Sequence, residues 1–181
     1  MRKTIFLTRM VFLLSITMAV ELVGLPQPVT GPFVNFMLIL TTLFISTGGG
    51  CVLSFITPVM AVLRGQLPAP LAPMAPFIII ANFLFVVSFA LLRTNQLQSS
   101  GRFYFRNGAA VTAAAIIKFA TLYVAAQFLL PLILGKTLPA RMISLMALPQ
   151  LITALAGGWL ALFFYHLWQK KYLKTDIHKT E

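Results

Sequence analysis

The residues best able to do chemistry in this sequence are the polar side chains that interrupt its long apolar runs. A polar side chain in lipid costs several kcal/mol unless it faces a partner or a cavity. The interrupting residues are Glu21, Asn35, Arg64, Asn82, Lys118, Gln127 and Gln150. In the topology argued below, Lys118 lies near mid-depth and the other six fall in the outer half of the membrane. This distribution predicts a polar pocket that opens to the outside.

Lys118 poses the sharpest question, because the only carboxylate in any apolar span is Glu21, at the far end of its own span. Two interpretations are open: an anionic substrate group pairs with Lys118, or the amine is neutral or bonds to backbone carbonyls freed at a helix break. Asn82 lies in a wholly apolar stretch, and its amide can both donate and accept. The Asn82 side chain therefore either contacts a ligand or forms a hydrogen bond to a neighbouring helix.

The same two roles are open for Asn35 and Arg64. Gln150 is a weaker candidate for ligand contact because it follows Pro149, where its side chain would satisfy a kink. Gln127 is weaker still, since at 100° per residue it falls nearly opposite Lys118 on the same helix.

Residues for catalysis or metal binding are scarce. Two of the three carboxylates, Asp176 and Glu181, lie in the C-terminal tail, and the sequence holds no HExxH motif, phosphate-binding loop or paired carboxylates. The single cysteine, Cys51, excludes an internal disulfide and offers no metal-ligand spacing. We therefore expect a protein that is not an enzyme, with no catalytic residues, cofactor or metal.

The elements that position these residues are predicted to be membrane-spanning helices. Of the 181 residues, 59% are hydrophobic and 9% charged, which a water-soluble surface cannot accommodate. At roughly 20 residues per crossing, the chain forms one domain over residues 1–181 with about six spans and a basic tail over 169–181. The predicted spans are 4–22, 33–47, 50–64, 73–92, 109–134 and 141–168.

Charge chooses six helices over five. The apolar run 33–63 is either one long helix or two short helices hinged at Gly48-Gly49-Gly50. With two helices, ten Lys or Arg residues fall on the side of both termini and three on the other side, as the positive-inside rule requires. One long helix would give six against seven. The predicted fold is therefore an all-α integral membrane protein with six transmembrane helices and both termini in the cytoplasm.

The net charge of +11 is explained by this topology and by anionic lipid head groups, so we expect no nucleic-acid partner. Two external segments, 21–32 and 64–76, are rich in proline and are predicted to be stiff, non-helical covers over the pocket. They could instead be tight connectors with proline in the first helical turn. On the first helix, the small residues Ser15 and Ala19 lie four apart and permit close helix approach, within the protein or to a partner.

The strings Pro-Val-Thr-Gly-Pro-Phe-Val-Asn35, Thr57-Pro58 and Gly65-Gln-Leu-Pro-Ala-Pro, in a six-helix chain of this length, resemble the substrate-binding S components of energy-coupling factor vitamin transporters. The resemblance spans residues ~5–165. It implies a subunit of the bacterial cell membrane that captures a vitamin or related micronutrient from outside. It also implies as partners a transmembrane coupling subunit and two ATP-binding cassette ATPases.

The resemblance further implies which positions bind and dock. The substrate would contact Gln27 and Thr30 in the loop after the first helix, with Asn82, Lys118 and Gln150 below. The family often docks onto the coupling subunit through an Ala-xxx-Ala face, which here reads Ser15-xxx-Ala19.

Two other functions are open. The chain could be a small membrane assembly or scaffold protein whose polar residues bind helix to helix. It could also be an autonomous secondary carrier or channel, although no inverted repeat is evident and almost no intramembrane carboxylate is present for proton coupling.

Overall fold

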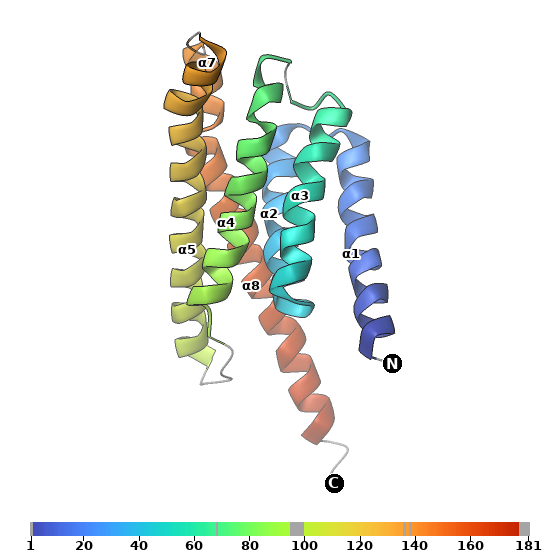
Figure 1. Ribbon diagram of the computed structural model, residues 1–181. Helices are drawn as coiled ribbons and strands as arrows, with labels where there is room; N and C mark the ends of the chain where they lie inside the picture. Colours follow the sequence, from blue (N-terminus) through green and yellow to red (C-terminus); the bar gives the residue numbers. More distant parts are fainter. Residues whose placement is uncertain (1, 68, 95–99, 136, 138, 178–181) are drawn as a thin grey trace.

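A computed structural model describes residues 2–67, 69–94, 100–135, 137 and 139–177. All regular structure in these residues is helical (Figure 1). The elements are α1 (Arg2–Val23), α2 (Gln27–Phe44), α3 (Thr47–Leu63), the 3-10 helix η1 (Ala69–Met74), α4 (Ala75–Leu92), α5 (Ser100–Val124), the π-helical turn η2 (Ala125–Leu129), α6 (Leu130–Leu134), α7 (Ala140–Leu145) and α8 (Leu148–Ile177). Lys136 and Lys179 of the charge count, and residues 178–181 of the predicted tail, lie outside the described residues.

The prediction of an all-α membrane protein is confirmed. Within the described chain, five helical segments are long and apolar enough to cross a membrane, and α3 is a shorter apolar helix. Large apolar side chains such as Leu7, Leu91 and Leu132 are more than half exposed, as lipid-facing residues are. The start of α1 and the end of α8 lie at the same end of the bundle (Figure 1), as an even number of crossings requires. We call the opposite end, which the charge count predicts to face outward, the outer end.

The break between α2 and α3 is present but displaced from the predicted glycines. It falls at Ile45 and Ser46, and the Ser46 hydroxyl caps α3 by accepting a hydrogen bond from the Gly49 backbone N–H at 3.1 Å. The three glycines lie in the first turn of α3 instead, and close packing requires glycine at position 50. A Cβ on Gly50 would lie 2.3 Å from Thr42 Oγ1, so α3 can approach α2 this closely only with glycine there.

The prediction that segment 21–32 is non-helical is wrong. Pro26 is the N-cap of α2 and Pro28 lies in its first turn, where a missing N–H costs nothing. The helix therefore begins at Gln27 rather than at 33, and the alternative of a tight, proline-capped connector describes this segment. The same prediction is wrong for much of segment 64–76, which contains η1 and the start of α4 at Ala75. Leu71 and Met74 of η1 are buried.

The long helices also differ at their ends from the predicted spans. Helix α5 begins at Ser100 rather than at 109 and runs without interruption through η2 into α6. The widened π turn lies just before Pro131, whose ring cannot fit against a regular preceding turn. The predicted span 141–168 is two helices, since Met146 ends α7 before α8 begins.

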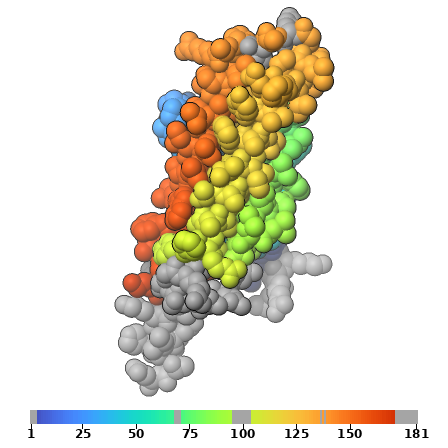
Figure 2. Space-filling model, turned by 90° about the vertical axis from the view of Figure 1, so that its left-hand side faces the viewer, coloured from blue at the N-terminus to red at the C-terminus, as the bar shows by residue number. Residues whose placement is uncertain are grey.

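Helix α2 packs at the centre of the bundle, where Leu38 and Ile39 are fully buried. On one side α8 approaches its backbone at Gly157, where a Cβ would lie 2.3 Å from the Pro32 carbonyl oxygen. Helices α5 and α8 lie side by side on the face shown in Figure 2. A second buried cluster, which includes Leu71, Leu122 and Met146, lies toward the outer end. Leu71 and Met146 of this cluster also line the candidate site.

Candidate functional site

A cavity of about 330 Å³ opens at the outer end of the bundle, within the size range of small-molecule sites. Most of its wall is apolar, and its polar side chains converge from six helices. The polar lining residues are Glu21 of α1, Gln27, Thr30 and Asn35 of α2, Thr57 of α3, Gln66 after α3, Asn82 of α4, Lys118 of α5 and Gln150 of α8. Apolar walls with a few convergent polar groups are typical of ligand sites.

Lys118 and Asn35 form a buried polar contact in the wall of the cavity. The Lys118 ammonium donates to Asn35 Oδ1 at 2.6 Å and lies 5.5 Å from the centre of the Phe85 ring. The Asn35 amide nitrogen donates in turn to the Gly31 carbonyl at 2.9 Å and to Thr153 Oγ1 at 3.5 Å. Because its nitrogen is occupied, Asn35 must present its oxygen to Lys118. The amine is therefore held by a neutral oxygen and not by backbone carbonyls at a helix break.

Two buried acceptors in the cavity wall have no hydrogen-bond partner among the described residues: Asn82 Oδ1 and Glu21 Oε2. Their side chains are 2% and 3% exposed. Leaving a buried polar atom unpaired costs about 1–3 kcal/mol, so such atoms in a cavity wall favour a ligand that would pair with them. Neither Glu21 nor Lys118 forms an ion pair within the described part of the chain.

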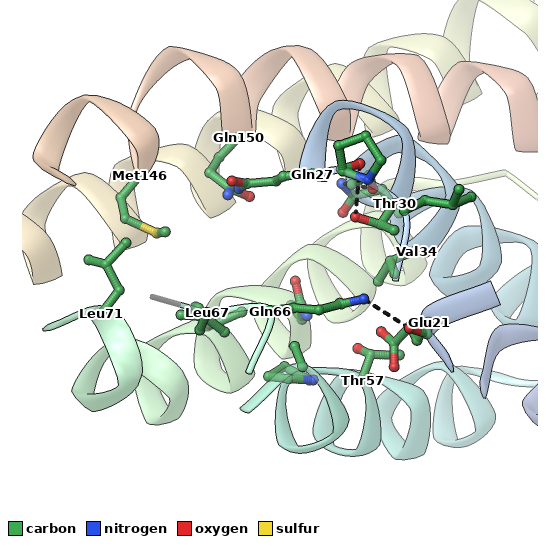
Figure 3. A pocket seen from close by; sticks show the side chains of 18 of the residues that line it. Glu21, Gln27, Thr30, Val34, Thr57, Gln66, Leu67, Leu71, Met146 and Gln150 are labelled. Atoms are coloured by element: carbon green, nitrogen blue, oxygen red, sulfur yellow. Dashed lines mark hydrogen bonds between the residues drawn. The ribbon is translucent and has the colours of Figure 1, made fainter. Parts of the chain in front are cut away.

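The mouth of the cavity is closed on one side by the segment that follows α3. Figure 3 shows Gln66 reaching across to Glu21, and its amide donates to the Glu21 backbone carbonyl at 2.8 Å. Arg64 donates to the Leu22 carbonyl at the end of α1. The turn between α1 and α2 passes through Gly24, whose φ of +73° favours glycine. These contacts tie the end of α1 to the end of α3.

The structure brings six of the seven predicted substrate residues to this one cavity: Gln27, Thr30, Asn35, Asn82, Lys118 and Gln150. Arg64 is not among the lining residues. It is exposed, and its guanidinium is used at the rim. Gln127, the weaker candidate, is exposed in η2 and does not line the cavity either.

Three polar lining residues were not predicted as substrate contacts: Glu21, Thr57 and Gln66. Figure 3 places them together on one side of the cavity, across from Gln27 and Gln150. Each carried a signal in the sequence. Glu21 is the only carboxylate of an apolar span, while Thr57 and Gln66 belong to the strings that resemble the transporter family.

The two residues predicted to dock a partner, Ser15 and Ala19, are both exposed on α1. Exposure excludes their use in close packing within the described chain, so docking is the interpretation that stays open. Most of the large side chains on α1 are apolar and exposed as well, including Leu7, Val11 and Phe12.

Among the described residues, no group of three or more His, Cys, Asp or Glu side chains could hold a metal ion together. No family model, curated protein or solved structure matches this chain.

Proposed function

We propose that this chain is the substrate-capture subunit of an energy-coupling factor type importer in a bacterial cell membrane. It binds a vitamin or related micronutrient from the outside and delivers it together with a transmembrane coupling subunit and two ATP-binding cassette ATPases. The observation that carries the proposal is the convergence of six predicted substrate residues from α2, α4, α5 and α8 on one cavity at the outer end.

The unpaired acceptors favour a receptor over a scaffold. Polar residues that serve only to join helices use their hydrogen-bonding groups on one another. Asn82 and Glu21 instead line the cavity, and each keeps a buried oxygen with no partner among the described residues. Because both oxygens are shielded from solvent, a small molecule would pair with them after a small rotation of either side chain.

The exposed face of α1 supports the proposed division of labour. Ser15 and Ala19 are small and accessible, which suits close contact with a helix of the coupling subunit. The sequence has no nucleotide-binding motif, so ATP would be hydrolysed by the partner ATPases and not by this non-enzymatic chain.

The test is binding by the purified subunit alone. The full chain is extracted in mild detergent, small molecules released by denaturation are identified by mass spectrometry, and affinities are measured by calorimetry with the compounds found. Asn82→Ala should weaken binding about 5- to 150-fold, the equivalent of losing about 1–3 kcal/mol when a buried partner is unpaired.

Asn107→Ala is the matched control. Asn107 is a fully buried asparagine near the opposite end of the bundle, where its oxygen accepts from the Thr94 N–H at 2.9 Å. Its replacement should lower stability but leave affinity unchanged. If no vitamin, precursor or cofactor fragment is released or bound, the receptor proposal fails. Transport by the chain alone in liposomes without ATP would show a secondary carrier instead.

A further inference from the structure

The geometry of the cavity points to a ligand with two distinct ends: an anionic group that binds Lys118 at the deep end, and N–H or O–H donors that bind Asn82 Oδ1 and Glu21 Oε2. We propose that the substrate is a small organic acid carrying such donors, with an apolar part between them. This inference rests on the proposed function and narrows the class of molecule that the subunit captures.

The deep end is suited to an anion. Lys118 is 3% exposed, and its only hydrogen-bond partner in the described chain is the neutral oxygen of Asn35. An ammonium group has three donors, so capacity is left for a second acceptor. A buried charge without a counter-charge is costly, and a carboxylate entering the cavity would supply that counter-charge through a short, charge-assisted hydrogen bond.

Asn35 acts as a positioning residue for this amine. Its nitrogen is committed to the Gly31 carbonyl, so its oxygen is fixed toward Lys118. Glycine at position 157 lets α8 lie directly against this turn of α2, which keeps Thr153 within reach of the same amide. The ammonium is therefore held in place before any ligand arrives.

The second set of contacts must be donors. Asn82 Oδ1 and Glu21 Oε2 are both buried and lack a partner among the described residues. The Asn82 carbonyl oxygen cannot donate, so it requires an N–H or O–H donor, whereas the Glu21 carboxyl accepts when it is ionised and donates when it is protonated. An acid without N–H or O–H groups would satisfy Lys118 but leave the Asn82 oxygen unpaired.

The spacing of the helices separates Lys118 from Glu21 by depth. At a rise of 1.5 Å per residue, Asn35 lies about 12 Å below the start of α2 and Asn82 about 10.5 Å below the start of α4, whereas Glu21 lies about 3 Å from the end of α1. Val34, Ile78 and Leu71 line the cavity as well and provide apolar contact. The acid is therefore expected to enter first, with one donor beside Asn82 and further donors toward Glu21 and the mouth.

The experiment uses vitamins and vitamin precursors in matched sets: acids with N–H or O–H donors, the methyl esters of the same acids, and neutral or cationic compounds. Binding to the purified full chain is measured by thermal shift and calorimetry. At least one donor-bearing acid should bind, and its methyl ester should bind roughly 10- to 100-fold more weakly, because the ester is uncharged and accepts only a weaker hydrogen bond from the ammonium.

Substitutions assign the two ends. Lys118→Met and Lys118→Gln should each remove the preference for acid over ester, and the second keeps a polar group in case the first fails to fold. Asn82→Leu should lower the affinity for the acid, but the protein should still bind the acid more tightly than its ester.

Four results would overturn the inference. If a neutral or cationic compound binds most tightly, or if acid and ester bind equally to the unmodified protein, the ligand class is wrong but the receptor function stands. If the acid preference survives in both Lys118 variants, the assignment to Lys118 is wrong. If no compound binds and none is released from the purified protein, both the ligand class and the receptor proposal fail.

Discussion

Gly157→Ala should destabilise the protein, although alanine is ordinarily the better helix former. A Cβ at this position would lie 2.3 Å from the Pro32 carbonyl oxygen, 2.6 Å from the Phe36 backbone nitrogen and 2.8 Å from Asn35 Cβ. Ordinary van der Waals contact begins at 3.4 Å, so the two helices must separate by about 1 Å. Two of these three atoms belong to the backbone and cannot rotate away.

The expected cost is about 1–3 kcal/mol, the usual range for adding a carbon to a well-packed interior. Function should suffer as well, because the same contact holds Asn35, whose oxygen fixes Lys118. We therefore expect weaker ligand binding in addition to lower stability.

The assay is reversible unfolding by SDS titration from mixed micelles, followed by the fluorescence of the two tryptophans of α8, Trp159 and Trp168. Gly48→Ala is the control, since Gly48 is exposed and the nearest atom to its added Cβ is Ser46 Oγ at 3.7 Å. This variant should be neutral or slightly more stable. If Gly157→Ala unfolds at the same SDS fraction as the parent protein, the close approach of α8 to α2 is refuted.

Three further predictions concern other contacts. Asn35→Leu should destabilise the protein by about 1–3 kcal/mol because it removes the hydrogen-bond partner of Lys118. In a double-mutant cycle of SDS unfolding, Lys118→Met in the same chain should restore much of the lost stability. Additive effects of the two substitutions would contradict this coupling. Gly108→Ala would place a Cβ 2.3 Å from the Trp159 ring, so it should lower stability and shift the tryptophan emission. Trp159→Phe in the same chain should restore much of the lost stability. Unchanged emission would contradict this packing of Gly108 against Trp159. Ser46→Ala should lower the free energy of unfolding by about 1 kcal/mol through loss of the α3 cap, measured in the same unfolding assay. Ser46→Asp, which can still cap the helix, should be about as stable as the parent protein. Equal stability of all three proteins would show that the cap contributes nothing.

Sequence reasoning reached the fold class and much of the candidate site because both follow from the cost of polar atoms in lipid. Composition required membrane-spanning helices, and the positive-inside count required a break after residue 33 that the structure has at Ile45 and Ser46. The same cost singled out Asn35, Asn82 and Lys118, which line one cavity. Their roles in binding stay predictions.

Helix boundaries were harder to predict from the sequence, because they depend on how the backbone N–H and C=O groups at each helix end are hydrogen-bonded. Prolines at positions 26 and 28 predict a non-helical segment, yet Pro at the first turn removes only a donor that has no partner there. Glycines 48 to 50 predict a hinge, but the break falls at Ile45 and Ser46, and close packing against α2 requires glycine at 50.

Apolarity, six crossings and the polar positions inside them were determined by the sequence itself, since each depends on residue type and spacing along one chain. Only the tertiary structure decided which of those positions meet. Asn35 and Lys118 are 83 residues apart and touch because α2 and α5 pack around one cavity. Arg64 instead donates to the Leu22 carbonyl at the end of α1, and Glu21 has a buried carboxyl oxygen with no partner among the described residues. Such pairings depend on how helices pack in space, which spacing along the chain does not specify.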